Sequence, residues 1–143
     1  MLGNATQQTY TGKNLCNGVN TDYYLGTNTQ VAGRLTNNSG LIVSVDGTSN
    51  YTVSTTGSQT RYRVACIDTT LEYNATTTGY NGQNKDGTSN SITIDTTGHS
   101  YLLVNATDLS KIQVEKGSSA TSYEPYTRTE KQVQVLTFLK MLM

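Results

Sequence analysis

Residues able to do acid–base or nucleophilic chemistry are few in this sequence and stand apart from one another. The one histidine, His99, lies in the stretch "TTGHSY", and no serine or cysteine has the context of a nucleophile elbow. Asp68 and Glu72 are the closest candidate pair of carboxylates, but glycoside hydrolysis needs two carboxylates that face each other across a cleft. The ten acidic residues are scattered, mostly in turns. We therefore predict that the protein is not an enzyme and that these side chains are solvated.

Metal ligands are equally sparse. The pentapeptide "DGTSN" occurs twice, at residues 46–50 and 86–90, and each copy has one carboxylate where a calcium loop needs several. Asp-Gly accommodates positive φ, so both copies are expected to be turns. Cys16 and Cys66 lack the C-x-x-C or histidine spacing of a zinc site, which favours buried free thiols over a single long-range disulfide. No metal or cofactor is expected.

Binding of a neutral, hydroxylated ligand suits the composition better than catalysis does. Sugars are held by aromatic faces that cover the apolar side of the ring and by planar polar groups that bond its hydroxyls. The chain is rich in Tyr, Asn and Thr. The candidate carbohydrate-binding residues are Tyr23, Tyr24, Arg61, Arg63, Tyr80, Asn81 and Asn84. For each of them, packing or ordinary surface polarity is the alternative interpretation.

Length and charge narrow the class of protein. At 143 residues the chain fits one domain, and charged residues make up 14% of it, well under the roughly 25% of an average soluble domain. Lys plus Arg equals Asp plus Glu at ten each, so no net field would gather nucleic acid. No stretch approaches the roughly 20 apolar residues of a membrane span, and "MLGNATQQTY" does not resemble a secretory signal. We expect a protein made in the cytoplasm that binds neither nucleic acid nor membranes.

Short runs of β-favouring residues recur between Gly, Asn and Asp turns, which predicts an all-β antiparallel sandwich or jelly roll. The runs are "DYYLG", "QVAGRLT", "GLIVSVDG", "NYTVSTTG", "TRYRVACID", "SITIDTTG", "SYLLVNA" and "KIQVEKG". Alternation predicts that Tyr62, Val64 and Cys66 share a core-facing side, with Arg61 and Arg63 pointing toward solvent or a groove. Residues 80–90, "YNGQNKDGTSN", are expected to form a long polar loop.

The last residues differ in character from the rest. In "TRTEKQVQVLTFLKMLM" the residues Val135, Phe138, Leu139 and Leu142 fall at i, i+3, i+4 and i+7, which would form one apolar stripe on a short helix. Left in water the stripe would be an exposed sticky patch, so a partner chain or the domain itself should cover it, unless the tail is foreign to the module. We therefore divide the chain into a lead-in (1–14), a sandwich module (15–126) and an oligomer-forming tail (127–143).

The segment "KIQVEKGSSATSYEPY" contains the only proline, Pro125. It resembles the closing sequence L-E-x-G-x-x-A-T-x-Y-E-P-Y of a jelly-roll module found in tail and baseplate proteins of bacteriophages and prophages of Gram-positive hosts. The matching residues are Val114, Glu115, Gly117, Ala120, Thr121, Tyr123, Glu124, Pro125 and Tyr126. At the other end "GNATQQTYTGKNL" is similar to the way such modules begin, although Cys16 replaces the usual large apolar residue. The resemblance covers residues 3–126.

Physically, this motif is expected to close the sandwich. Ile112 and Val114 would face the core on the last strand, and Gly117 would end that strand. Pro125 would forbid further ladder bonding, and the nearby tyrosines Tyr123 and Tyr126 would pack the exiting chain onto the sheet.

The resemblance implies a galactose-binding-like or carbohydrate-binding-module-like β-sandwich in a virion tail or baseplate, with host cell-surface glycan and other virion proteins as partners. It assigns no binding residue to a numbered position. The main alternative is a purely structural virion component that forms a homo-oligomer, with a trimer favoured, and binds no glycan. A glycosidase accessory domain is a minor third interpretation.

Overall fold

The computed structural model describes residues 5–26, 30–57, 61–78, 80–86 and 91–134. Within them the only helical element is one turn of 3-10 helix, η1 (Leu109–Lys111), and the predicted all-β class is confirmed. The strands are β1 (Ala5–Thr11), β2 (Tyr23–Leu25), β3 (Val31–Arg34), β4 (Gly40–Ser44), β5 (Asn50–Thr55), β6 (Arg61–Ile67), β7 (Thr76–Thr78), β8 (Tyr80–Asp86), β9 (Ile92–Asp95), β10 (Tyr101–Ala106), β11 (Ile112–Lys116) and β12 (Arg128–Gln134).

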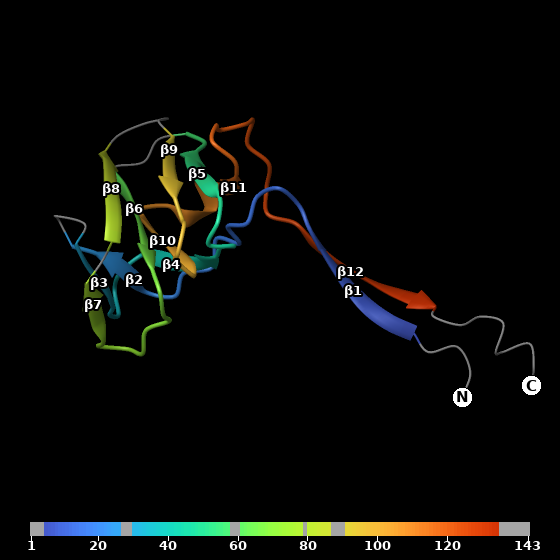
Figure 1. Cartoon of the computed structure of the whole chain (residues 1–143), viewed down its shortest axis with the longest axis horizontal. Helices are drawn as coiled ribbons and strands as arrows, with labels where there is room; N and C mark the ends of the chain where they lie inside the picture. The colour runs from blue at the N-terminus through green and yellow to red at the C-terminus, as the bar shows by residue number, and fades with distance from the viewer. Residues whose placement is uncertain (1–4, 27–29, 58–60, 79, 87–90, 135–143) are drawn as a thin grey trace, which may run out of the picture.

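The body of the fold is an antiparallel β-sandwich, and a smaller third sheet packs on the other face of its central sheet (Figure 1). The central sheet has strand order β4-β10-β6-β8, and its neighbours have the orders β11-β5-β9 and β2-β3-β7. A large apolar cluster that includes Val64 and Leu102 lies between the central sheet and β11-β5-β9. A smaller cluster that includes Ile67 and Leu103 lies between the central sheet and β2-β3-β7. The jelly-roll connectivity itself stays a prediction.

Side chains along β6 alternate between two faces of the sheet, and the sequence predicts the surroundings of one face correctly. Tyr62, Val64 and Cys66 all join the large core cluster. On the other side Arg63 was expected to reach solvent or a groove, and this is wrong: Arg63 is 6% exposed, and its Nη1 donates to the carbonyl oxygen of Leu25 at 2.9 Å. The reason is the third sheet, because β2 covers the face of the central sheet that a two-layer sandwich would leave open.

Residues 80–86 form a strand rather than part of a long loop. β8 pairs with β6 from Arg61↔Asp86 to Cys66↔Tyr80, with an irregularity between Val64 and Cys66. This polar run lacks an apolar alternation, so its side chains give little strand signal. It forms a strand because the open edge of β6 presents backbone N–H and C=O groups that need partners. Residues 87–90 lie outside the described part of the chain.

The first "DGTSN" copy is a turn, as predicted. Gly47 has φ +70°, and the Asp46 carboxylate accepts hydrogen bonds from the N–H groups of Thr48 and Ser49 at 2.9 and 3.0 Å. Lys116 Nζ lies 2.8 Å from Asp46 Oδ2. The hydrogen bond from Lys116, followed by the one from Thr48, lowers the pKa of Asp46. The turn after β4 is therefore tied to the end of β11.

Both cysteines are buried free thiols, which confirms the favoured interpretation over a disulfide. Burial raises the pKa of the Cys16 thiol, and it raises the pKa of Cys66 to about 11. Both thiols are therefore protonated at neutral pH and act as small apolar residues of the core.

The two ends of the chain form a separate two-stranded ribbon. β1 and β12 pair antiparallel from Ala5↔Gln134 to Thr11↔Arg128, and the ribbon projects away from the sandwich (Figure 1). Residues 128–134 are thus a strand. The helix predicted for the tail is wrong over this range, because β1 lies alongside and supplies backbone hydrogen-bond partners. The apolar stripe from Val135 to Leu142 lies outside the described residues.

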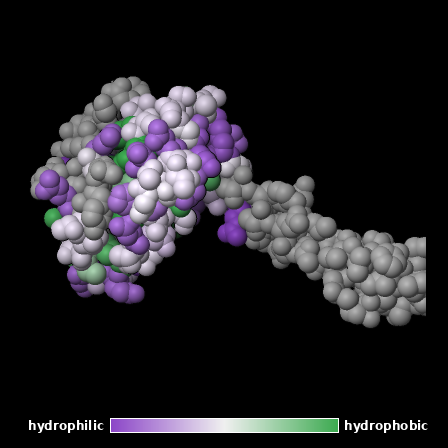
Figure 2. Space-filling view, in the orientation of Figure 1, coloured by the Kyte–Doolittle hydropathy of each residue, from purple (hydrophilic) through white to green (hydrophobic). Residues whose placement is uncertain are grey.

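The surface of the sandwich is mostly polar. On the face shown in Figure 2, hydrophilic and near-neutral residues predominate and apolar residues are scattered between them. The exposed large apolar residues of the described chain are Val19, Val31, Leu35, Tyr73 and Tyr123. Tyr123 lines one of the hollows described below, and Tyr73 stacks on Arg34, which lines another.

Candidate functional site

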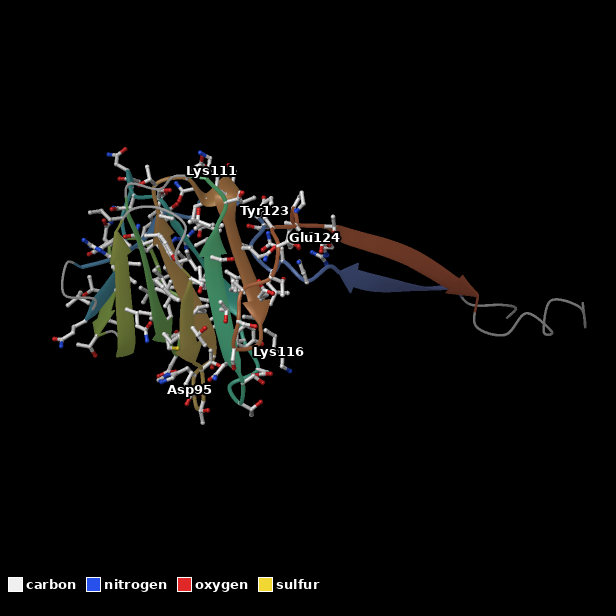
Figure 3. The ribbon with its side chains drawn as sticks, turned by 90° about the horizontal axis from the view of Figure 1, so that it is seen from above. Asp95, Lys111, Lys116, Tyr123 and Glu124 are labelled. Atoms are coloured by element: carbon white, nitrogen blue, oxygen red, sulfur yellow. The ribbon has the colours of Figure 1, made fainter. Side chains whose placement is uncertain are left out.

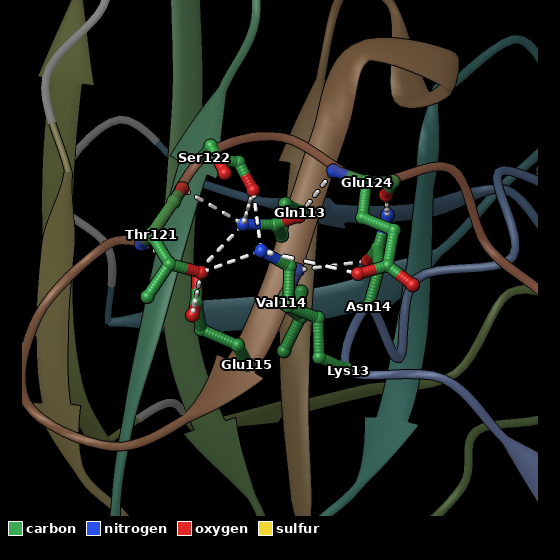
Figure 4. Close-up of polar contacts among 8 residues, drawn as sticks. All are labelled: Lys13, Asn14, Gln113, Val114, Glu115, Thr121, Ser122 and Glu124. Carbon is green, nitrogen blue, oxygen red and sulfur yellow. Dashed lines mark hydrogen bonds and ion pairs between the residues drawn. The ribbon is translucent and has the colours of Figure 1, made fainter.

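The residues of the closing motif form a polar network with the lead-in, here named the terminal clasp, in which Asn14, Gln113 and Glu115 are buried and Lys13 and Thr121 are exposed (Figure 4). Its members are Lys13, Asn14, Gln113, Glu115, Thr121 and Glu124. Asn14 is 1% exposed. Its Nδ2 donates to the carbonyl oxygens of Ile112 and Glu124 at 3.3 and 2.9 Å, and its Oδ1 accepts from the N–H groups of Cys16 and Val114 at 3.0 and 3.1 Å. One side chain thus joins the lead-in to the last strand of the sandwich and to the segment that leaves it.

Gln113 and Glu115 form the other half of the clasp. Gln113 Nε2 donates to Glu115 Oε2 at 2.7 Å, and Gln113 Oε1 accepts from the Glu124 N–H at 2.8 Å. Glu115 also accepts from the Thr121 hydroxyl and N–H at 2.7 and 3.1 Å. Among the described residues no buried side-chain nitrogen or oxygen lacks a hydrogen-bond partner. The motif residues Glu115, Thr121 and Glu124 therefore hold the returning segment against β11.

Ile112, Val114 and Gly117 of the closing motif lie as the sequence predicts. Ile112 and Val114 are 1% and 0% exposed in the core, and β11 ends one residue before Gly117, whose φ is +126°. The Tyr123 hydroxyl donates to the carbonyl oxygen of Ser110 at 2.9 Å. Tyr123 and Glu124 lie where the chain turns from the sandwich into the ribbon (Figure 3). Pro125 follows at once, so the sandwich closes before β12 begins.

The structure describes the side chains of three of the seven sequence-predicted binding residues, Tyr23, Tyr24 and Arg63. Tyr23 is buried and Tyr24 is half-buried, as the alternation of a strand requires. Arg63 is internal. The backbones of Arg61, Tyr80, Asn81 and Asn84 lie on the paired strands β6 and β8, and their side chains fall outside the described part of the structure. A hollow of about 350 Å³ lined by Gly82, Gln83, Ile94 and Asp95 lies next to them.

A second hollow is built around Arg34, at the end of β3. Its guanidinium carbon lies 4.3 Å from the centre of the Tyr73 ring and 5.3 Å from that of the Tyr23 ring, both cation–π distances. Nε donates to the carbonyl oxygen of Thr21 at 2.9 Å, and Nη1 donates to that of Leu71 at 3.1 Å. The guanidinium is therefore fixed in orientation by two rings and two carbonyl groups.

The two tyrosines beside Arg34 are themselves held in place. The Tyr73 hydroxyl donates to Asp22 Oδ2 at 2.9 Å, while the Tyr23 hydroxyl accepts from the Leu71 N–H at 3.0 Å. Tyr23 is 3% exposed and Tyr73 is 48% exposed. Tyr73 therefore presents an aromatic surface to solvent next to the Arg34 cation, whereas the Tyr23 ring is buried.

The hollow beside Arg34 has a volume of about 260 Å³. It is lined by Asn17, Val19, Thr21, Tyr23, Arg34, Leu41, Ile42 and Thr70. We call it the Arg34 hollow. Amide, hydroxyl, guanidinium and aromatic groups meet there, which are the groups that hold a saccharide. Among the predicted binding residues whose side chains are described, Tyr23 alone lines it.

Sequence reasoning missed Arg34 and Tyr73 because neither carries a local signal. Arg34 ends a short strand, and Tyr73 lies in a turn between β6 and β7 that Asn74 makes with φ +69°. They meet because β7 pairs with β3 and brings the preceding turn beside Arg34.

A third hollow adjoins the Arg34 hollow through Asn17, which lines both. Its volume is about 240 Å³. Its lining is Cys16, Asn17, Gly18, Leu109, Ser110, Tyr123 and Tyr126. Two tyrosines of the closing motif thus face a concave surface.

The candidate acid–base groups do not pair with each other as a carboxylate dyad. His99 Nδ1 lies 2.8 Å from Asp68 Oδ1 on the surface, so the partner of Asp68 is His99 rather than Glu72.

Comparison with models of protein families, with curated protein sequences and with solved structures gave no match to this chain. Among the described residues no helix is long and apolar enough to span a membrane.

Replacing Asn14 by Ala is expected to destabilise the sandwich by roughly 2–6 kcal/mol, since the buried N–H groups of Cys16 and Val114 would lose their acceptor at about 1–3 kcal/mol each. The measurement is urea unfolding followed by circular dichroism. The matched control is Asn17→Ala, because Asn17 is exposed and bonds only locally, to the N–H of Val19 at 2.9 Å. An equal loss in both variants would contradict the role of the clasp.

Glu115→Gln should cost about 1–3 kcal/mol at pH 7 and progressively less in acid. Burial of Glu115 acts to raise its pKa, but the hydrogen bonds from Thr121 and Gln113 and the charge of Lys13 outweigh it, so the folded-state pKa lies below 4.5. Because the folded pKa is depressed, this stabilisation is present above the unfolded pKa and is lost as the pH falls through the folded value. Unfolding free energies from pH 7 to pH 3 test this, with the exposed carboxylate of Glu72→Gln as control. A gap that stays constant with pH would be the contrary result.

Proposed function

We propose that this protein is a non-catalytic saccharide-binding β-sandwich module of a phage tail or baseplate, with the Arg34 hollow as its binding site. The observation that carries the proposal is Arg34 itself, fixed between two tyrosine rings at a hollow on a weakly charged, hydroxyl-rich surface. The exposed ring of Tyr73 would cover the apolar face of a sugar. The amide of Asn17 and the hydroxyls of Thr21 and Thr70 would bond its hydroxyl groups.

The assignment to a virion appendage is supported by the sequence resemblance and by the contacts that the resembling residues make. The two matching segments, one at each end of the module, meet in the terminal clasp through Asn14 and Val114. A motif whose residues join both ends of a fold is expected to recur wherever that fold recurs. Host cell-surface glycan is the proposed ligand.

A second candidate function is assembly of a homo-oligomer, with a trimer favoured, or attachment to other virion proteins. The observation in its favour is the β1–β12 ribbon. Within the described residues each strand of this ribbon has one hydrogen-bonded neighbour, so each leaves an open edge. An isolated two-stranded sheet is marginal in water, and open edges pair readily with other chains.

The binding proposal predicts that Tyr73→Ala lowers glycan affinity roughly three- to ten-fold, through loss of the stacking surface. A glycan array of bacterial surface saccharides would give the ligand, and isothermal titration with that ligand would measure the change. Tyr73→Phe keeps the ring and should retain most of the affinity. Tyr24→Ala and Tyr80→Ala report on the other predicted positions. Loss of binding in Tyr80→Ala with full binding in Tyr73→Ala would move the site to the β6–β8 edge.

The assembly function predicts that the full chain is a trimer and that a chain lacking residues 129–143 is a monomer, because the deletion removes nearly all of β12. Light scattering coupled to gel filtration measures both. A monomeric full chain would rule out an assembly role for the ribbon on its own.

A further inference from the structure

Among the residues that the structure describes, the guanidinium of Arg34 has no carboxylate partner. Its hydrogen bonds go to the carbonyl oxygens of Thr21 and Leu71, and its faces meet tyrosine rings. No ion pair within 4.0 Å joins it to an acidic group of the described chain. A cation held by neutral acceptors keeps its full charge. Half-buried, it attracts an anion more strongly than an exposed cation in bulk water would.

The carboxylate of Asp22, the residue before β2, bonds other partners. Its Oδ2 accepts from the Tyr73 hydroxyl at 2.9 Å, and its Oδ1 accepts from Asn20 Nδ2 at 3.1 Å. Asp22 therefore orients the ring that stacks on Arg34 and does not bond the guanidinium. The other residues that line the hollow carry no charge.

Part of the guanidinium remains available to a ligand. A guanidinium has five N–H donors, and the bonds to Thr21 and Leu71 use one on Nε and one on Nη1. Nη2 makes no hydrogen bond to the described chain. One N–H of Nη1 and both N–H groups of Nη2 are left, and an Nη1–Nη2 edge is one by which arginine bonds two oxygens of one carboxylate or phosphate group side by side.

We propose that the Arg34 hollow recognises an acidic saccharide, with a carboxylate or phosphate group on the Nη1–Nη2 edge of Arg34 and the sugar ring against Tyr73. This inference rests on the proposed saccharide-binding function and names the class of its ligand. Tyr73 and Asp22 are positioning residues that hold the fork in place.

Arg34 also has a structural interpretation, since it ties the segment before β2 to the turn after β6. A purely structural tie would make binding indifferent to an acid group on the sugar. The two interpretations therefore differ in ligand preference, which is measurable in the unmutated protein.

The experiment compares matched sugars by NMR titration of the full ¹⁵N-labelled chain. Methyl glucoside, methyl glucuronide and glucose 6-phosphate form one set, and the three galactose counterparts form a second. We expect an acidic member to bind about ten-fold or more tightly than its neutral partner, as a charge-assisted pair of hydrogen bonds would give. The advantage should shrink as salt rises from low to physiological ionic strength. Whether the uronate or the phosphate binds more tightly identifies the anionic group.

Variants of Arg34 localise the preference. Arg34→Gln should abolish the advantage of the acidic sugar, and Arg34→Lys should keep only part of it, because a point charge lacks the fork. If Arg34→Gln unfolds, the matched sets and the salt series in the unmutated protein decide alone. Equal binding of neutral and acidic members overturns this inference and leaves the saccharide-binding proposal standing. Absence of binding by every member at millimolar concentration overturns both.

Discussion

Closure of the sandwich depends on the burial of polar side chains at the terminal clasp. Asn14, Gln113 and Glu115 are all nearly inaccessible to water, so each must find its hydrogen bonds inside the protein. The partners come from segments about one hundred residues apart, as the bond from the Val114 N–H to Asn14 Oδ1 shows. Satisfying these groups fixes where the lead-in lies, where the exiting chain crosses it, and hence where β1 meets β12. If some of these buried groups were left without partners, the fold would be less stable than one with apolar contacts in their place. The two ends of the module are therefore specified together.

The second constraint is the three-sheet stack. Because β2-β3-β7 covers the outer face of the central sheet, β6 and β10 are buried on both sides. Arg63 on β6 is therefore internal and donates a hydrogen bond to β2. The same small sheet carries the Arg34 hollow at its border. The proposed binding surface is therefore on the added layer and not on the strands whose alternation was clearest. The lining of the Arg34 hollow combines the polar residues Asn17, Thr21, Arg34 and Thr70 with Val19, Tyr23, Leu41 and Ile42, of which Tyr23 and Leu41 belong to the apolar clusters.

The chemistry of this surface follows from composition and from one uncompensated charge. The chain has equal numbers of acidic and basic residues and many hydroxyl and amide side chains, so selectivity has to come from placement rather than from a broad field. Two rings and two carbonyl groups place Arg34, and Asp22 is kept from neutralising it by Tyr73 and Asn20. The neighbouring hollow beside Tyr123 and Tyr126 lies next to it across Asn17, which would allow more than one sugar residue of a chain to contact the protein.

Local sequence patterns were enough to predict the all-β class, the core-facing sides of β6 and β11, the first Asp-Gly turn and closure near Pro125. These depend on local alternation and turn chemistry, which act between near neighbours. Only the tertiary structure decided that Arg63 is internal, that residues 80–86 pair as an edge strand, that residues 128–134 join the lead-in, and that Arg34 meets Tyr73. Each of these depends on which distant segment lies alongside, because burial on a second face, a backbone partner and a hollow are all supplied by other parts of the chain.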